Sequence, residues 1–314
     1  MIDFIEFISG LFINGMSVMT VGILVNRWFE SSRGLAAGIA FAGSGIIAAI
    51  LVPFCNYVIE RRGIASGYLM LPIALIVLSL PVLIFIVRDY PKELGLCPYK
   101  KHSSKFDGSE DIRNSAEDVG ITREKAFRMP SYWFVFAAVA GIAICQASPN
   151  TNTVSILADI GYPASFGATI ASVNMVLLTL CKIGIGRVFD KAGSYLGSMI
   201  IGVSCILFPL IALFNQVNFV PWIYIFFLAI ATSGSSVLGN FLTADYFGTK
   251  DYDRLYSVIA LATQLGAAIS SPIFGRIYDL TGGYTKAWLI VSGLGAVVCV
   301  LLTAAYKTAH KGTR

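Results

Sequence analysis

The sequence predicts an all-α polytopic membrane protein. Hydrophobic residues make up 56% of the 314 residues, charged residues make up only 13%, and the mean hydropathy is +0.74. A soluble domain carries about 25% charged residues, so this chain lacks the polar surface that would coat a globule in water. Apolar segments of about 20 residues, long enough to cross a bilayer as helices, recur along the chain. The lipid bilayer is therefore the expected surroundings of the folded chain.

The apolar segments divide the chain into predicted helices and one polar linker. They lie near residues 3–26, 34–59, 66–88, 130–150, 164–188, 195–215, 220–244, 255–277 and 285–306. The charge-rich stretch 89–129 interrupts the series, and its composition is typical of a mostly disordered linker with short amphipathic helices. We therefore expect three regions: residues 1–88 with three helices, the linker 89–129, and residues 130–314 with six helices.

The placement of Lys and Arg predicts the orientation in the membrane. Cytoplasmic loops carry the excess of these residues. If the Arg27–Arg33 loop is cytoplasmic, the linker 89–129, the Arg187–Lys191 loop, the Lys250–Arg254 loop and the tail from Lys307 are cytoplasmic too. The opposite side receives only Arg61, Arg62, Arg276 and Lys286. We expect a multi-pass protein of the plasma (cell inner) membrane, with the amino terminus outside and the carboxy terminus inside.

The residue inventory excludes several classes of function. Basic residues are scattered over loops rather than gathered on one face, so no nucleic-acid partner is expected. The six cysteines contain no CxxC pair, and His102 and His310 both lie in polar segments. We therefore expect no metal site, no cofactor and no disulfide framework, and we interpret the cysteines as small packing residues. No histidine lies inside a span for a metal or a Ser-His pair, and no Gly-x-Gly-Asp motif accompanies Tyr278-Asp279, so an enzyme is not expected.

Two loop motifs and one longer segment carry a family resemblance. The first is Trp28-Phe29…Arg33-Gly34-Leu35-Ala36, the second runs from Gly186 to Gly193 in the pattern Gly-x-x-x-Asp-Lys-x-Gly, and the third extends from Tyr246 to Tyr284. In this order they resemble the major facilitator superfamily of transporters, and in particular its monocarboxylate and oxalate/formate branch. Ser194 stands where the second motif ordinarily ends in a basic residue. The resemblance spans nearly the whole chain and matches helices four to twelve, which implies that the first three helices are missing.

The resemblance implies a function and a gate. It implies a secondary active transporter that moves a small organic anion, a monocarboxylate, by alternating access, as proton symport or anion exchange. The loop with Gly186, Arg187, Asp190 and Lys191 would be the cytoplasmic latch that breaks as two helix bundles rock. The residues themselves fit this role, because Asp190 follows a predicted helix end, where its carboxylate can face the N-terminus of a neighbouring helix. The alternative is an ordinary charged loop that only sets topology.

Lys182 is the strongest candidate for contact with a substrate. It lies inside an apolar span, where a charge is costly and usually faces a cavity or a partner. Members of the branch place an Arg at the matching position, four residues before Gly186, so the resemblance implies a counter-charge for a substrate carboxylate. The alternative is a lysine about 9 Å from the helix end whose stem reaches the membrane surface. Oxalate exchangers of the branch carry a second Lys where this chain has Leu261–Gln264, which favours a monoanion over a dianion.

Uncharged polar residues in the spans are further candidates. The four that we place in the binding site are Gln146, Asn150, Asn174 and Gln264. Gln146 and Asn150 lie one turn apart and would share a helix face. Buried amides also hold membrane helices together, at about 0.6 kcal/mol each, so each of these residues is either a ligand or structural glue. Gly34 and Gly38 have the spacing of a small-residue helix interface.

Two other interpretations fit the same sequence. The chain could be a non-transporting fragment of such a transporter, or a binding or sensor protein that uses the same fold without moving its ligand. Accumulation of a small anion inside vesicles would separate a transporter from both. If the protein is complete, we expect it to act as a monomer.

Overall fold

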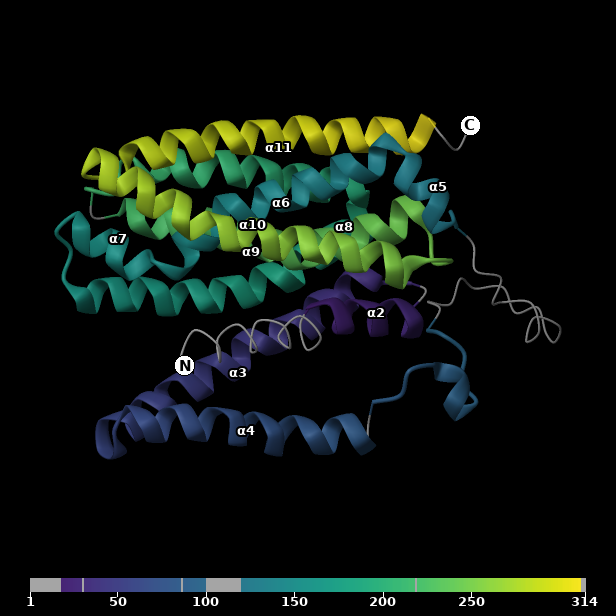
Figure 1. Cartoon of the computed structure of the whole chain (residues 1–314), viewed down its shortest axis with the longest axis horizontal. Helices are drawn as coiled ribbons and strands as arrows, with labels where there is room; N and C mark the ends of the chain where they lie inside the picture. The colour runs from purple at the N-terminus through teal and green to yellow at the C-terminus, as the bar shows by residue number, and fades with distance from the viewer. Residues whose placement is uncertain (1–17, 30, 86, 100–119, 218, 312–314) are drawn as a thin grey trace.

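The computed structural model describes residues 18–29, 31–85, 87–99, 120–217 and 219–311, and this part of the chain is helical, with no β-strand. The long helices lie roughly along the long axis of the molecule, and successive helices reverse direction (Figure 1). In chain order the α-helices are α2 (Val18–Trp28), α3 (Arg33–Arg62), α4 (Ile64–Phe85), α5 (Arg123–Arg128), α6 (Pro130–Thr151), α7 (Thr153–Asp159), α8 (Ala164–Ala212), α9 (Val220–Phe247), α10 (Tyr252–Thr281) and α11 (Thr285–Lys311). The all-α prediction is therefore confirmed.

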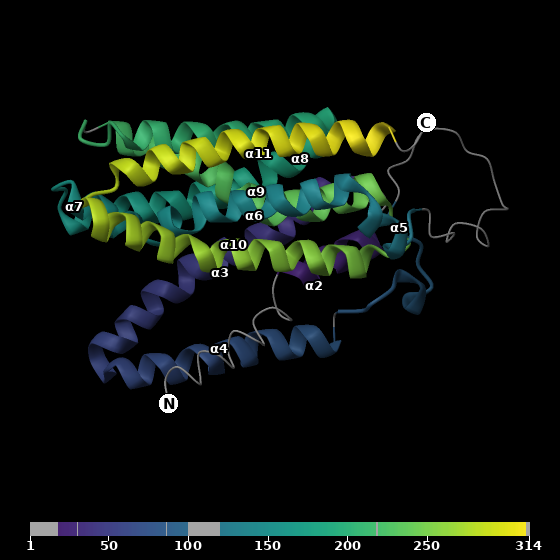
Figure 2. The ribbon, with the colours of Figure 1, turned by 45° about the horizontal axis from the view of Figure 1, so that its top comes forward.

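The helices form two groups that meet at one end of the molecule. The C-terminal group, α6–α11, packs side by side, and the N-terminal group, α2–α4, lies along one side of it (Figures 1 and 2). We call the end that carries Trp28, Arg33, Arg123 and Lys311 the linker end. α2 and the start of α3 lie against the C-terminal group there, whereas α4 and the second half of α3 diverge from it towards the opposite end (Figures 1 and 2).

Most described residues of the predicted spans are helical, but two spans end earlier than predicted: α4 ends at Phe85 rather than at residue 88, and α8 ends at Ala212 rather than at residue 215. Residues 3–17 of the first span fall outside the described residues, and the remainder of that span is α2. The linker contributes a short 3-10 helix, η1 (Pro91–Leu94), together with α5, and residues 100–119 are likewise outside the description. Among the described residues, five helices are long and apolar enough to cross a membrane, namely α6, α8, α9, α10 and α11.

A glycine divides α8 into the two spans that the sequence predicts. As one straight rod, the 49 residues of α8 would extend about 74 Å, more than twice the roughly 30 Å of a hydrocarbon core. Gly193 interrupts the helix with φ 82° and ψ 172°, a conformation that only glycine adopts without strain. The chain can therefore turn at the linker end within the second loop motif.

Small residues allow the helices of the C-terminal group to pack closely. A Cβ atom at Gly266 of α10 would overlap the carbonyl oxygen of Ala140 on α6 and would come within 2.9 Å of the Ala143 Cβ. The thiols of Cys145 and Cys205 are buried in the same group, in the packing role that the sequence predicts. Lipid is as apolar as a leucine side chain, so helices in a membrane associate through such close contacts rather than through expulsion of water.

This packing predicts opposite effects for two glycines of α10. Gly275 has open space around the Cβ position, so Gly275→Ala should leave stability unchanged or raise it by about 0.5–1 kcal/mol, because alanine is the better helix former. Gly266→Ala should lower stability by about 1–3 kcal/mol through overlap with α6. Thermal unfolding of the two purified variants in the same detergent measures the difference. Equal melting temperatures would contradict the close α6–α10 contact.

Candidate substrate site and gate

The N-terminus of α3 is capped by a residue from the C-terminal group. Ser32, the N-cap residue of α3, has φ 59° and ψ 32°, and its side chain makes no capping hydrogen bond. Instead, the backbone N–H groups of Gly34 and Leu35 donate to the carboxylate of Asp190 on α8, at 2.9 and 2.7 Å. The first turn of a helix has unpaired N–H groups and a partial positive charge, so a carboxylate stabilises it. Asp190 thus joins the two groups of helices at the linker end.

Glycines bring α3 and α8 close enough for this cap to form. A Cβ atom at Gly34 would overlap the carbonyl oxygen of Gly186, and one at Gly186 would overlap that of Gly34. One turn further along α3, Gly38 lies against the backbone of Lys182 and Ile183. The small-residue interface that the spacing of Gly34 and Gly38 predicts is therefore formed with α8.

The basic residues of the second loop motif form no ion pair with Asp190. Arg187 and Lys191 are exposed, and neither makes an ion pair with Asp190, although the structure describes all three residues. The cap on α3 therefore rests on backbone N–H groups alone. A sequence cannot reveal these partners, because every residue except proline carries the same N–H group.

Lys182 lies buried between α3 and α8, with only 9% of its surface exposed. Its ammonium group donates to the carbonyl oxygen of Phe41 and to the hydroxyl oxygen of Ser44, both at 3.1 Å and both on α3. No carboxylate forms an ion pair with it among the described residues. Lys182 is therefore a buried charge on a helix apolar enough to span a membrane, and its described partners are neutral dipoles at the joint between the two groups.

The structure pairs two of the four candidate amides with each other. The amide nitrogen of Asn174 on α8 donates to the amide oxygen of Asn150 on α6, at 2.9 Å. Gln146 is buried one turn before Asn150, and Gln264 is partly buried on α10. Lys182 makes no hydrogen bond with Gln146, Asn150 or Asn174, all of which lie in described parts of the chain. The Asn150–Asn174 bond holds α6 on α8, which is the structural alternative raised for these residues.

A second set of contacts joins the two groups at the linker end. The guanidinium of Arg27, at the end of α2, donates to the Asp253 carboxylate in the first turn of α10 at 2.5 Å, and it lies 4.5 Å from the centre of the Tyr90 ring. Beside it, the amide nitrogen of Asn26 donates to the amide oxygen of Asn240 on α9 at 2.9 Å. In the sequence, Arg27 indicates only the orientation of the chain in the membrane. Its partner lies 226 positions away, and nothing in a single sequence links the two.

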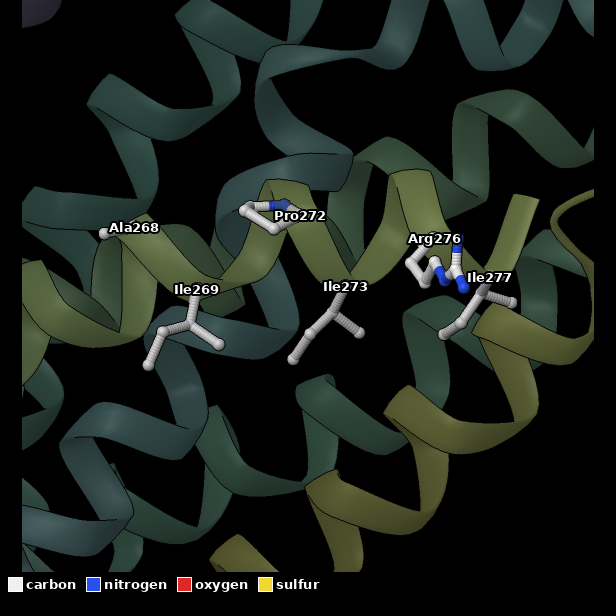
Figure 3. Close-up of a pocket in the computed structure, with 6 residues that line it drawn as sticks. All are labelled: Ala268, Ile269, Pro272, Ile273, Arg276 and Ile277. Atoms are coloured by element: carbon white, nitrogen blue, oxygen red, sulfur yellow. The ribbon is translucent and has the colours of Figure 1, made fainter. Parts of the chain in front are cut away.

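A hollow on α10 is separate from these contacts. It is lined by Ala268, Ile269, Pro272, Ile273, Arg276 and Ile277. All six residues belong to α10, and Ile269 and Ile273 project from the same side of that helix (Figure 3). A single helix supplies the whole lining, and Arg276 is its only charge, so the hollow is an open apolar surface rather than an enclosed polar site.

The chain is similar to known proteins of the monocarboxylate and oxalate/formate branch, the branch that its motifs resemble. Over 286 residues the chain is 26% identical to the oxalate:formate antiporter of Oxalobacter formigenes, covering 88% of this chain and 63% of that protein. It is 25% identical over 303 residues to monocarboxylate transporter 12 of Xenopus laevis, covering 92% of this chain and 64% of that one. The chain thus spans less than two thirds of the length of these relatives.

The fold and the family agree. A crystal structure of the fucose:proton symporter of E. coli matches 91% of this chain and 72% of its own, with a TM-score of 0.61 at 14% identity. A second crystal structure of the same symporter, in the outward conformation, matches with a TM-score of 0.55, also at 14% identity, over 87% of this chain and 68% of its own. At such identity these similarities concern the fold alone. The sequence model of the Major Facilitator Superfamily matches residues 4–228 and 153–314, and the chain therefore belongs to this superfamily of multi-pass membrane transporters, which are not enzymes.

Proposed function

We propose that the protein is a secondary active transporter that moves a small organic anion, a monocarboxylate, across the membrane. The observation that carries the proposal is the buried ammonium of Lys182, which has two neutral acceptors and no carboxylate partner among the described residues. Neutral dipoles compensate a buried charge only in part, so an anionic ligand would be bound there with a favourable charge pairing. The names of two relatives support the same substrate class: one is an oxalate:formate antiporter, and the other is a monocarboxylate transporter.

A monoanion fits this site better than a dianion does. Lys182 supplies one positive charge, and its ammonium is a point charge rather than the bidentate fork of an arginine. The segment Leu261–Gln264 on α10 adds no cation. Of the candidate amides, we assign Gln146 and Gln264 to the uncharged end of the ligand, while Asn150 and Asn174 position α6 against α8.

The proposed mechanism is alternating access between α2–α4 and α6–α11. The bonds from Asp190 to the start of α3 and from Arg27 to Asp253 both cross between these groups at the linker end, whereas the groups diverge at the opposite end (Figures 1 and 2). We interpret this arrangement as a gate closed at the linker end. Gly186 permits the close approach, and the exposed Arg187 and Lys191 are free to contact lipid headgroups. We place the linker end in the cytoplasm and the protein, as a monomer, in the plasma membrane.

Uptake into proteoliposomes tests the transport activity. The full chain, reconstituted from detergent, should accumulate labelled formate, acetate or lactate above the level of empty vesicles, and oxalate should be carried less well. A pH gradient would drive proton symport, whereas vesicles preloaded with unlabelled anion would drive exchange. Saturable binding without accumulation would instead indicate a sensor, and the absence of both would indicate a non-transporting fragment.

Substitution of Lys182 tests the anion site. Lys182→Gln removes the charge but keeps a polar side chain, and it should lower the initial rate of monocarboxylate uptake roughly 10- to 100-fold, the range expected for losing a charged hydrogen bond. Lys286→Gln is the matched control, because Lys286 is exposed at the start of α11. Unchanged uptake by Lys182→Gln, with both variants equally inserted, would remove Lys182 from the substrate site.

Substitution of Asp190 tests the gate. Asp190→Asn keeps the shape of the side chain but removes its negative charge from the N-terminus of α3, and the amide oxygen can serve the two N–H groups only weakly. The closed state should lose about 0.6–2 kcal/mol, which corresponds to a three- to thirtyfold shift between states and a lower uptake rate. Asp279→Asn, an exposed carboxylate at the far end of α10, serves as the control. Wild-type uptake by Asp190→Asn would show that the loop only sets topology.

A further inference from the structure

Lys182 does more than present a charge, because both of its acceptors belong to the other group of helices. Its ammonium has three N–H donors, and the two bonds described for it end on Phe41 and Ser44 of α3. The Ser44 hydroxyl in turn donates to the Phe41 carbonyl oxygen at 2.7 Å. These three groups form a small polar cluster at the α3–α8 joint, about 12 Å from Asp190 along α8 at 1.5 Å per residue.

α3 does not need Lys182 to satisfy its own polar groups. The Phe41 carbonyl lies inside a helix, where it has the backbone N–H four residues later as its regular partner, and it also accepts the Ser44 hydroxyl. If Lys182 turned away, α3 would keep both of these bonds. The ammonium of Lys182, in contrast, would lose both of its acceptors. A buried charge without a hydrogen-bond partner costs free energy, unless a new partner accepts from it.

A bound carboxylate would be that partner. Hydrogen bonds between an ammonium and a carboxylate are about twice as strong as those to neutral acceptors, and they use the same N–H groups. We propose that Lys182 is an exchangeable tether: without substrate it ties α8 to α3 through Phe41 and Ser44, and a bound monocarboxylate takes over its N–H groups and releases α3. This inference rests on the proposed function and adds the step that couples binding to movement of the two groups.

The tether makes a prediction that a simple binding site does not. Because Ser44 competes with the anion for Lys182, Ser44→Ala should bind acetate, formate or lactate about two- to tenfold more tightly than wild type, the range expected for losing one competing hydrogen bond. Ser172→Ala is the matched control, since Ser172 is exposed as Ser44 is and its hydroxyl makes a similar bond to its own helix, with the Ala168 carbonyl at 2.9 Å. Ser44→Thr, which retains the hydroxyl, should bind as wild type does.

Hydrogen exchange on the wild-type chain gives an independent measurement. Saturating acetate should accelerate amide exchange in residues 38–48 of α3, whereas a ligand that merely bridges the groups would slow it. Affinities come from calorimetric titration of the full chain in detergent with the three anions. If wild type binds none of them, the proposed function fails. If wild type binds and Ser44→Ala binds equally or more weakly, or if α3 exchanges more slowly, the tether is wrong while the anion site stands.

Discussion

The arrangement of the two groups of helices depends on the close backbone contact between α3 and α8. Gly34 and Gly186 each leave room for the other's carbonyl oxygen, and any side chain at either position would push the helices apart. Only at this separation can the Asp190 carboxylate reach the N–H groups of Gly34 and Leu35. Inside a bilayer the hydrophobic effect does not drive helices together. Close packing and interhelical hydrogen bonds of this kind therefore hold the helices in contact.

The contacts within the C-terminal group differ in chemistry from those between the groups. Inside α6–α11, apolar side chains, buried thiols and glycines fill the space, and the bonds named there are between neutral groups, such as Asn174 and Asn150. Between the groups, the named bonds involve a lysine, an aspartate, an arginine paired with an aspartate, and a pair of asparagines. The charged groups between the two sets of helices have alternative partners in headgroups, water or a ligand, whereas tight apolar packing has none of comparable strength. This difference suits one rigid body moving against another.

α10 has an exposed apolar face. The hollow along Ala268–Ile277 is apolar, and Ala268, Ile269 and Pro272 in its lining are exposed (Figure 3). The relatives are longer than this chain, which covers 63–64% of the first two. A membrane-spanning helix can expose such a face to lipid without penalty, so the exposure by itself is consistent with a stable fold.

The sequence by itself determined the all-α membrane class, the approximate positions of the described helices, a loop between the spans 164–188 and 195–215, and the superfamily, because length, hydropathy and motif spacing are local properties that each segment carries alone. It also selected Lys182 and Asp190, since a charge inside or at the edge of an apolar span stands out without any partner. Only the tertiary structure decided what these charges contact. Their partners are the Phe41 carbonyl, the Ser44 hydroxyl and two backbone N–H groups, none of which a residue pattern distinguishes. The Arg27–Asp253 pair likewise joins residues 226 positions apart, and its geometry exists only once α2 and α10 are packed at the same end of the molecule.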